Sequence, residues 1–167
     1  DELDVDAAII FSDILVIPEA MGLPYEMIKG KGPHFPRVIE SAADIEALNS
    51  SEEHTLEELK YVFEALKKTR AQLAPEKTLI GFSGAPWTLL AYMLEGGGSK
   101  TFSKARKFLV QEPKLAHELL EKLSQNIIHY MRAQEAAGAE VLQLFDSWAG
   151  LLSPKLYQEF AMPYVKR

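Results

Sequence analysis

The chain has 167 residues, of which 47% are apolar and 25% are charged, and its net charge is −6. These values are ordinary for a globular protein and exclude a disordered tail or a fibrous repeat. The absence of cysteine excludes disulfides, a thiol nucleophile and cysteine-ligated zinc. The acidic balance argues against binding nucleic acid, and no apolar run reaches the roughly 18 residues that span a membrane. A chain without cysteine suits the reducing cytoplasm, so we expect a cytoplasmic protein.

Three short apolar runs are candidates for buried strands, and each ends in polar or small residues. Residues 5–11 end at Ser12 and Asp13, residues 77–82 end at Ser83 and Gly84, and residues 139–145 end at Asp146 and Ser147. Residues 18–37, between the first strand and the first long helix, are broken by proline and glycine. They predict a long loop with about one helical turn and no hairpin.

Helical patterns occupy the segments between the strands. Thr55 and Glu58 have the spacing of a capping box, which predicts a helix over residues 55–73. Pro86 starts a second helix that Gly96 ends, and Gly138 ends a long one. The expected helices cover residues 55–73, 86–95, 101–110 and 114–137, and one runs from Ser153-Pro154 to the end of the chain.

This alternation predicts an α/β fold with a parallel sheet, in a single domain over residues 1–167. The carboxyl ends of parallel strands lie at one edge of the sheet, where α/β proteins carry their chemistry. Candidate site residues are therefore the polar residues at the strand ends.

Three short motifs resemble known sites, but each lacks a required residue. Residues 81–85 resemble the nucleophile elbow of α/β-hydrolases, but no histidine follows Asp146, where that fold needs one. Ser99 stands where a phosphate-binding P-loop needs glycine. Glu121 replaces the second histidine of the zinc motif that starts at His117. We expect no metal site, and we expect His117 and His129 to be solvated residues of an amphipathic helix.

Asp13 has two interpretations from the residues alone. A carboxylate that directly follows an apolar strand lies at the floor or rim of a pocket, or it caps the turn that comes next. Tyr92 could likewise be a core residue of its helix. Trp87 and Trp148 are expected to pack near the same rim.

One long segment favours the functional interpretation of Asp13 and Tyr92. Residues 81–96, GFSGAPWTLLAYMLEG, closely resemble the second signature of the uroporphyrinogen decarboxylase family, and residues 9–15 and 142–147 resemble two further blocks of it. The similarity covers essentially the whole chain. It implies a partial (β/α)8 barrel, with about strands two to four and their helices. The implied reaction converts the four acetate arms of uroporphyrinogen, which carries eight carboxylates, to the methyl groups of coproporphyrinogen in haem biosynthesis, without a cofactor.

The resemblance also assigns residues. Asp13 matches the family's central catalytic carboxylate, which binds the substrate, and Tyr92, Ser147 and Phe145 match positions that contact the substrate or line the same wall. A carboxylate beneath the macrocycle can accept hydrogen bonds from pyrrole N–H groups. It can also stabilise the cation that forms when a ring carbon is protonated.

Parts of the family pattern are missing. The arginine-bearing first signature and a histidine near the carboxyl end are absent, and the chain starts at Asp1 and stops at Arg167, inside a predicted helix. We expect an internal piece of a longer enzyme that is inactive alone. A homodimer is the expected assembly. The alternatives are a corrinoid-linked methyltransferase of a related barrel and a fragment without catalytic activity.

Overall fold

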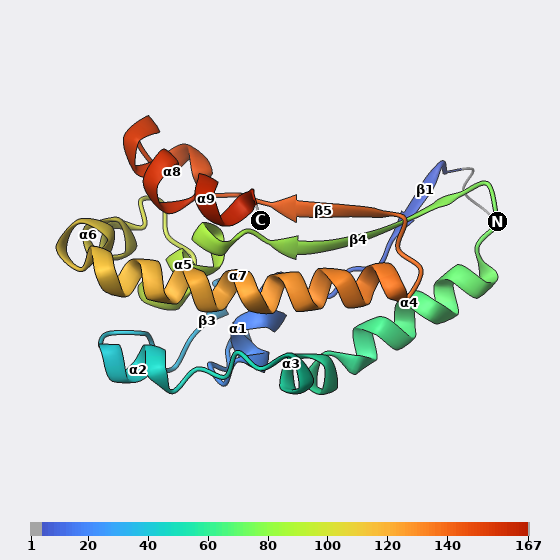
Figure 1. Cartoon of the computed structure of the whole chain (residues 1–167), viewed down its shortest axis with the longest axis horizontal. Coiled ribbons are helices and arrows are strands. Elements are labelled where there is room, and N and C mark those ends of the chain that lie inside the picture. The colour runs from blue at the N-terminus through green and yellow to red at the C-terminus, as the bar shows by residue number, and fades with distance from the viewer. Residues whose placement is uncertain (1–4, 167) are drawn as a thin grey trace.

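The computed structural model describes residues 5–166, and its centre is a sheet of three parallel strands (Figure 1). The strands lie side by side in chain order: β1 (Ala7–Ile9), β4 (Thr78–Gly84) and β5 (Val141–Phe145). Ala7 lies opposite Thr78, and Ile80 lies opposite Val141. Each predicted strand is present and starts one or two residues later than expected. The predicted α/β class with a parallel sheet is confirmed.

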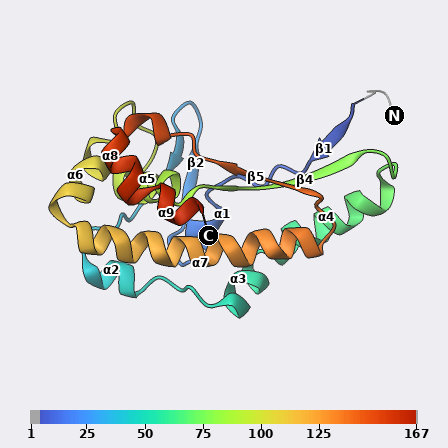
Figure 2. The same cartoon turned by 45° about the horizontal axis from the view of Figure 1, so that its top comes forward.

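Helices cover one face of this sheet. The longest, α7 (Pro113–Ala136), runs along β4 and β5 and buries an apolar stripe that includes Leu119, Leu123 and Ile127 (Figures 1 and 2). No helix within residues 5–166 is long and apolar enough to cross a membrane. The other helices are α1 (Val16–Ala20), α2 (Ala42–Glu46), α3 (Glu52–Glu58), α4 (Lys60–Gln72), α5 (Pro86–Glu95), α6 (Ser103–Gln111), the 3-10 turn η1 (Ala149–Leu151), α8 (Pro154–Phe160) and α9 (Met162–Val165).

The prediction of one helix over residues 55–73 with a capping box at Thr55 and Glu58 is wrong. Ser51 caps α3 by accepting a hydrogen bond from the backbone N–H of His54 (3.3 Å), and the helix breaks at Leu59. Thr55 lies inside α3, where its hydroxyl bonds to the carbonyl of Ser51 (3.0 Å) and to the side chain of Asn126 on α7. Packing against α7 therefore uses the threonine that the local pattern assigned to a cap.

The expectation of a single helix after Ser153 is also wrong. Ser153 caps α8 as expected and accepts a hydrogen bond from the N–H of Leu156 (3.3 Å). The helix then stops at Phe160, and Pro163 begins a new turn as part of α9. Proline cannot continue a helix because it lacks an N–H and its ring clashes with the preceding turn.

A hairpin occupies the segment for which no hairpin was expected. Strands β2 (Glu26–Ile28) and β3 (Gly32–His34) pair antiparallel, and Glu26 lies opposite His34. Gly30 and Gly32 both have a positive φ, which glycine adopts without strain and which lets the chain reverse over so few residues. The hairpin signal was therefore these two glycines rather than an alternating apolar pattern.

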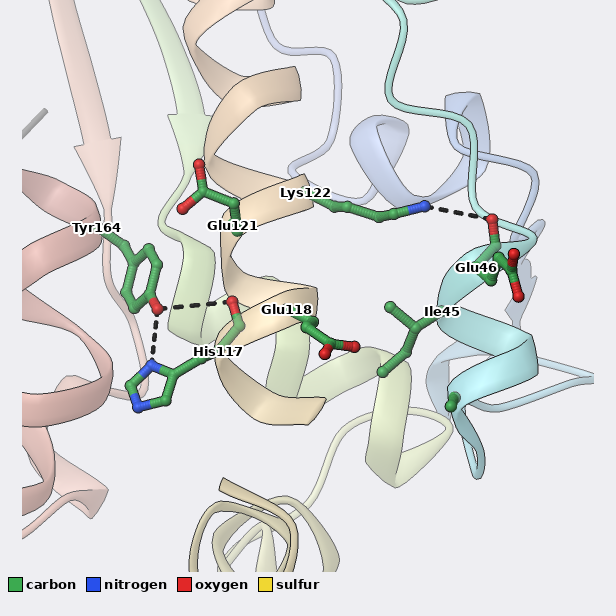
Figure 3. Close-up of a pocket in the computed structure, with 8 residues that line it drawn as sticks. Ile45, Glu46, His117, Glu118, Glu121, Lys122 and Tyr164 are labelled. Carbon is green, nitrogen blue, oxygen red and sulfur yellow. Dashed lines mark hydrogen bonds between the residues drawn. The ribbon is translucent and has the colours of Figure 1, made fainter. Parts of the chain in front are cut away.

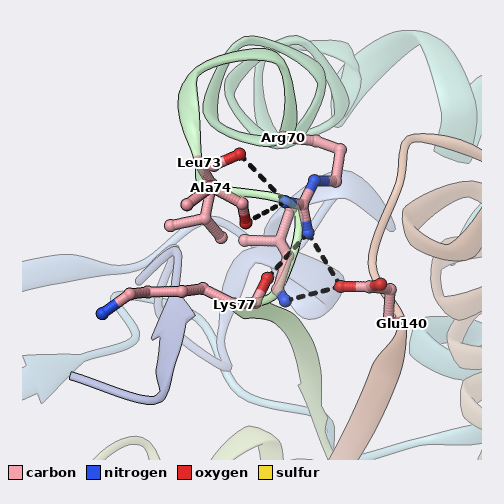
Figure 4. Close-up of polar contacts among 6 residues, drawn as sticks. Arg70, Leu73, Ala74, Lys77 and Glu140 are labelled. Carbon is pink, nitrogen blue, oxygen red and sulfur yellow. Dashed lines mark hydrogen bonds and ion pairs between the residues drawn. The ribbon is translucent and has the colours of Figure 1, made fainter.

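An arginine clamps the loops at the amino end of the sheet (Figure 4). The guanidinium of Arg70 on α4 donates to the carbonyls of Leu73 (3.1 Å), Ala74 (2.9 Å) and Lys77 (2.9 Å). It also forms an ion pair with Glu140 at 2.8 Å. Glu140 in turn accepts the backbone N–H of Leu79 on β4 (3.0 Å). One side chain thus fixes the end of α4 and the starts of β4 and β5.

We predict that Arg70→Met lowers the free energy of unfolding by about 2 kcal/mol, because three backbone carbonyls and a carboxylate lose a charged donor. Urea unfolding followed by circular dichroism measures this difference. Lys67→Met removes an exposed charge from the same helix and should change stability by less than about 0.5 kcal/mol. Equal stability of the two variants would contradict the proposed role of the clamp.

Candidate active site

The four residues singled out from the sequence line one cavity of about 360 Å³ at the carboxyl ends of the strands. Asp13 follows β1, Tyr92 lies on α5, Phe145 ends β5 and Ser147 lies in the turn after it. As expected, Asp13 and Tyr92 therefore face the same space. The remaining lining residues are largely apolar: Ile9, Phe11, Ile14, Leu15, Pro33 and Phe82.

Asp13 fulfils both of its sequence interpretations. It lines the cavity, and its Oδ1 accepts the backbone N–H of Leu15 (2.8 Å), which caps the turn into α1. Its φ is +51°, in the left-handed region that aspartate tolerates better than most residues. The turn bond uses one carboxylate oxygen, so the group can hold its orientation and still accept hydrogen bonds from a ligand.

Tyr25 lies beside Asp13 and was missed by sequence reasoning. Burial, the negative charge of Asp13 and hydrogen bonding to Asp13 together raise the pKa of Tyr25 to about 12. Its ring packs on Phe35, with the centroids 5.8 Å apart. A neutral hydroxyl therefore stays next to the carboxylate at every physiological pH. No local pattern identifies Tyr25, because it approaches Asp13 only through the path of the loop before β2.

Aromatic rings form one wall of the cavity. Phe82 of β4 stacks on Phe11 with a centroid distance of 5.9 Å, and Phe145 of β5 meets Phe82 edge-on at 5.6 Å. Phe82 is only 3% exposed, whereas Phe11 is 81% and Phe145 is 40% exposed. The outer two rings therefore offer apolar surface to a flat ligand, and the central ring is held in place by the sheet.

A second aromatic group holds Tyr92 from behind. The Tyr92 ring meets Phe102 at 5.5 Å and Trp148 at 6.1 Å, and these two rings are 4.7 Å apart. Trp87 donates its indole N–H to the carbonyl of Trp148 (3.0 Å). Tyr92 thus packs against these rings and also lines the cavity. Trp148 lies next to a cavity residue as expected, whereas Trp87 is a fully buried core residue.

The turn that carries Ser147 is tied to the start of α5. The hydroxyl of Thr88 donates to Asp146 Oδ1 (2.8 Å) and accepts the backbone N–H of Trp148 (3.3 Å). Burial raises the pKa of the Asp146 carboxyl. The sequence predicted Asp146 at a strand end, but the contact between Thr88 and Asp146 could be recognised only in the folded structure. These bonds position Ser147 rather than contact a ligand.

Ser83, the remaining polar strand-end residue, does not reach the cavity. Its side chain is 1% exposed and donates to the carbonyl of Gly84 (3.2 Å). A hydrolase nucleophile must be exposed next to a base, so the arrangement disagrees with that reading of residues 81–85.

A larger hollow of about 620 Å³ lies on the helical side, between α2, α7 and α9 (Figure 3). It contains none of the four predicted site residues. There His117 bonds to the Tyr164 hydroxyl (2.7 Å) and stacks on Phe160 at 4.6 Å, so it is packed rather than freely solvated. His129 lies 3.7 Å from Glu52. Within residues 5–166, no group of three or more His, Asp or Glu side chains is placed to hold a metal ion.

Comparisons with known proteins identify the family of this chain. The uroporphyrinogen decarboxylase (URO-D) family model matches residues 1–167. Uroporphyrinogen decarboxylases of Ovis aries and Pongo abelii are 51% and 50% identical over 97% of this chain, which covers 44% of each. That of Chlorobaculum parvum is 48% identical over the whole chain, which covers 47% of it. The chain thus spans about half the length of the curated relatives it matches.

A solved structure of a methyltransferase from Methanosarcina mazei superposes with a TM-score of 0.77 over 96% of this chain and 47% of its own. At 23% identity this similarity shows the fold alone. The parallel sheet, with a carboxylate and aromatic rings at its carboxyl edge, places the chain in the class of α/β folds whose sites lie at the strand ends. Within that class, the chain belongs to the uroporphyrinogen decarboxylase family. The family match favours the decarboxylase over the methyltransferase expected as the alternative.

The contact between Tyr130 of α7 and Ser12, the residue before Asp13, can be tested through its effect on stability. Its hydroxyl bonds to Ser12 Oγ (2.9 Å), and burial raises its pKa to about 12. Because the folded-state pKa lies above the unfolded value of about 10, stability is complete below pH 10 and is lost as the pH rises toward 12. Between pH 8 and pH 11 we expect a loss of about 1.4 kcal/mol from this group.

Tyr130→Phe should lower stability by about 1 kcal/mol at pH 8, because Ser12 loses its partner. The variant should also lose less stability than the parent between pH 8 and pH 11. Urea unfolding at both values measures the difference, and the parent protein is the control for lysine titration. The same loss in both proteins would show that Tyr130 ionises normally.

Proposed function

We propose that this chain provides the central carboxylate and the aromatic wall of a uroporphyrinogen decarboxylase, which converts uroporphyrinogen to coproporphyrinogen. One observation carries the proposal: Asp13, Tyr92, Phe145 and Ser147 meet in one cavity at the strand ends. They come from three separate segments of the chain, and each matches a position of the family pattern. Because the chain spans about half of its relatives, the activity is proposed for a protein of full family length.

The chemistry follows from the position of Asp13. An acetate arm loses CO₂ only if the pyrrole ring accepts the electron pair of the breaking C–C bond, and protonation of a ring carbon makes the ring a cationic acceptor. The Asp13 carboxylate accepts hydrogen bonds from pyrrole N–H groups and stabilises that cation. The arm then takes up a proton in place of CO₂ and becomes a methyl group. This step needs no redox partner.

The other lining residues orient the substrate in this proposal. The exposed faces of Phe11 and Phe145 fit a flat apolar macrocycle. The hydroxyls of Tyr92 and Ser147 can donate to its carboxylate arms. The reaction proposed for these residues requires no metal or other cofactor.

The architecture that we propose is a partial (β/α)8 barrel in one domain, with β1, β4 and β5 as about the second to fourth strands. Three observations support it. The strands are added in chain order in one direction, and the methyltransferase of similar fold covers 96% of this chain. The sheet face opposite α7, which a barrel would enclose, exposes large apolar side chains: Ile9 and Val141 are each 48% exposed.

We predict that Asp13→Asn slows turnover by about 10²–10³ while substrate binding changes little, because a neutral amide cannot offset the developing cation. The measurement is coproporphyrinogen formation by a decarboxylase of full family length that carries this sequence. The asparagine Oδ1 can still accept the N–H of Leu15, so the turn should remain folded. Asp6→Asn, an exposed carboxylate outside the cavity, is the matched control. Near-normal turnover of the Asp13 variant would remove Asp13 from the mechanism.

We further propose that the 167-residue chain by itself is inactive, self-associates as a homodimer and is cytoplasmic. Within residues 5–166, β1 and β5 each leave one edge unpaired, and such edges favour pairing with another chain. Size-exclusion chromatography with light scattering should show a dimer, and the same sample should form no coproporphyrinogen. An active monomer would contradict both statements, and an inactive monomer would contradict the association alone.

A further inference from the structure

Another hollow, separate from the one in Figure 3, lies directly beside the Asp13 cavity. It has a volume of about 370 Å³, and Pro33 of β3 lines both spaces. The β2–β3 hairpin forms one of its sides, and the loop of Gly96–Gly98 after α5 forms the other. Its lining residues are Ile28, Lys31, Pro33, His34, Glu95, Gly96, Gly97 and Gly98.

Backbone contacts fix the shape of this hollow. The N–H of Phe35 donates to the carbonyl of Gly96 (3.0 Å), and His34 forms a β-bridge with Gly97. A Cβ atom at Gly97 would lie 2.7 Å from the Pro33 carbonyl oxygen, so only glycine permits this approach. The hairpin and the loop are therefore held together by main-chain groups and close contact.

The charges around the hollow favour an anion. Lys31 lines it, and within the described residues the structure gives this ammonium no ion pair. Among the described lining residues, Glu95 is the only carboxylate, and its Oε2 accepts the backbone N–H groups of Lys104 (3.1 Å) and Ala105 (3.3 Å) at the start of α6. The acid is therefore directed to the helix, and Lys31 is left to meet a ligand.

Within residues 5–166, none of the ten side chains that line the Asp13 cavity is cationic, although the proposed substrate carries a carboxylate on every arm. The cation on the other side of Pro33 is Lys31. We propose that Lys31, the hairpin turn and the loop of Gly96–Gly98 form a subsite for a carboxylate arm of the substrate while its pyrrole N–H groups face Asp13. This inference rests on the proposed function.

A lysine suits this task better than an arginine. Its ammonium is a compact charge on a flexible stem, whereas a guanidinium demands a planar, two-pronged partner. Four acetates must react in turn, so a different arm faces the hairpin after each turn of the macrocycle. A mobile cation can meet each of these arms. Lys31 thus acts on substrate position, and the expected effect of its loss is on binding.

The test measures binding of coproporphyrin III, a stable macrocycle with four carboxylates, to the 167-residue chain. Trp87 and Trp148 are its only tryptophans, and Trp148 packs on Tyr92 of the cavity, so quenching of their fluorescence reports occupancy. Lys31→Met should raise the Kd about fivefold, as expected for a partly exposed ion pair. Lys29→Met removes the same charge from the same turn but lies outside both hollows, and it should leave the Kd unchanged. Equal effects of the two variants would overturn the subsite.

A second probe separates this inference from the proposed function. Tricarballylate, a small tricarboxylate, should shift the amide NMR signals of Lys31, Gly97 and Gly98 in the parent chain and not in Lys31→Met. If tricarballylate acts this way but coproporphyrin does not bind, the anion subsite stands and the porphyrin assignment fails. If coproporphyrin binds and neither probe responds to Lys31→Met, the subsite is wrong and the proposed function stands.

Discussion

A buried glutamine holds the wall of the candidate site. Gln134 of α7 is 2% exposed, and its side chain accepts the backbone N–H of Phe82 and donates to the carbonyl of the same residue, each at 2.9 Å. β1 pairs with β4 only as far as Ile9 and Ile80, so Phe82 lies beyond the end of that pairing. The glutamine amide thus takes the place of a neighbouring strand, and no polar backbone group of Phe82 is left without a partner in the core.

This contact explains a glycine of the family signature. A Cβ atom on Gly81 would lie 2.6 Å from Gln134 Oε1 and 3.0 Å from Leu142, so any larger residue would push the glutamine out of reach. Loss of the pair would leave buried donors and acceptors unsatisfied, at about 1–3 kcal/mol each. It would also release Phe82, the ring on which Phe11 and Phe145 rest. The aromatic wall therefore depends on a side chain from the opposite face of the sheet.

The sequence predicted the parts of the site that local patterns encode. Apolar runs identified the three strands, and the polar residues at their ends identified Asp13 and Ser147. The hairpin was missed because its evidence was the backbone conformation of Gly30 and Gly32 rather than any alternation. The helix break at buried Leu59 was missed because the helical pattern runs through it without interruption, whereas α3 and α4 pack against α7 as separate helices.

The residues that hold the site in position could not be predicted from local sequence patterns. Gln134 meets Phe82 across 52 positions, and Thr88 meets Asp146 across 58. Such pairs depend on tertiary folding, and either member alone is an ordinary polar residue. Backbone strain is also found at the site. Asp13 and Phe102 are the only non-glycine residues of the described chain with a positive φ. Asp13 lines the cavity, and Phe102 packs on Tyr92. Backbone strain of about 1–2 kcal/mol at each is tolerated where surrounding packing enforces it.

The positions of Asp13 and Lys31 suggest how this acidic chain could bind a substrate that carries many carboxylates. A cation inside the cavity would pair with Asp13 and compete with the pyrrole N–H groups for its oxygens. Among the described residues that line the cavity there is no such cation, and the neutral hydroxyl of Tyr25 lies beside the carboxylate. In the proposed complex, the centre of the macrocycle would face Asp13, and one acidic arm at a time would point outward to Lys31. The separation of the two charges by Pro33 would orient the substrate without neutralising the group that stabilises the cation.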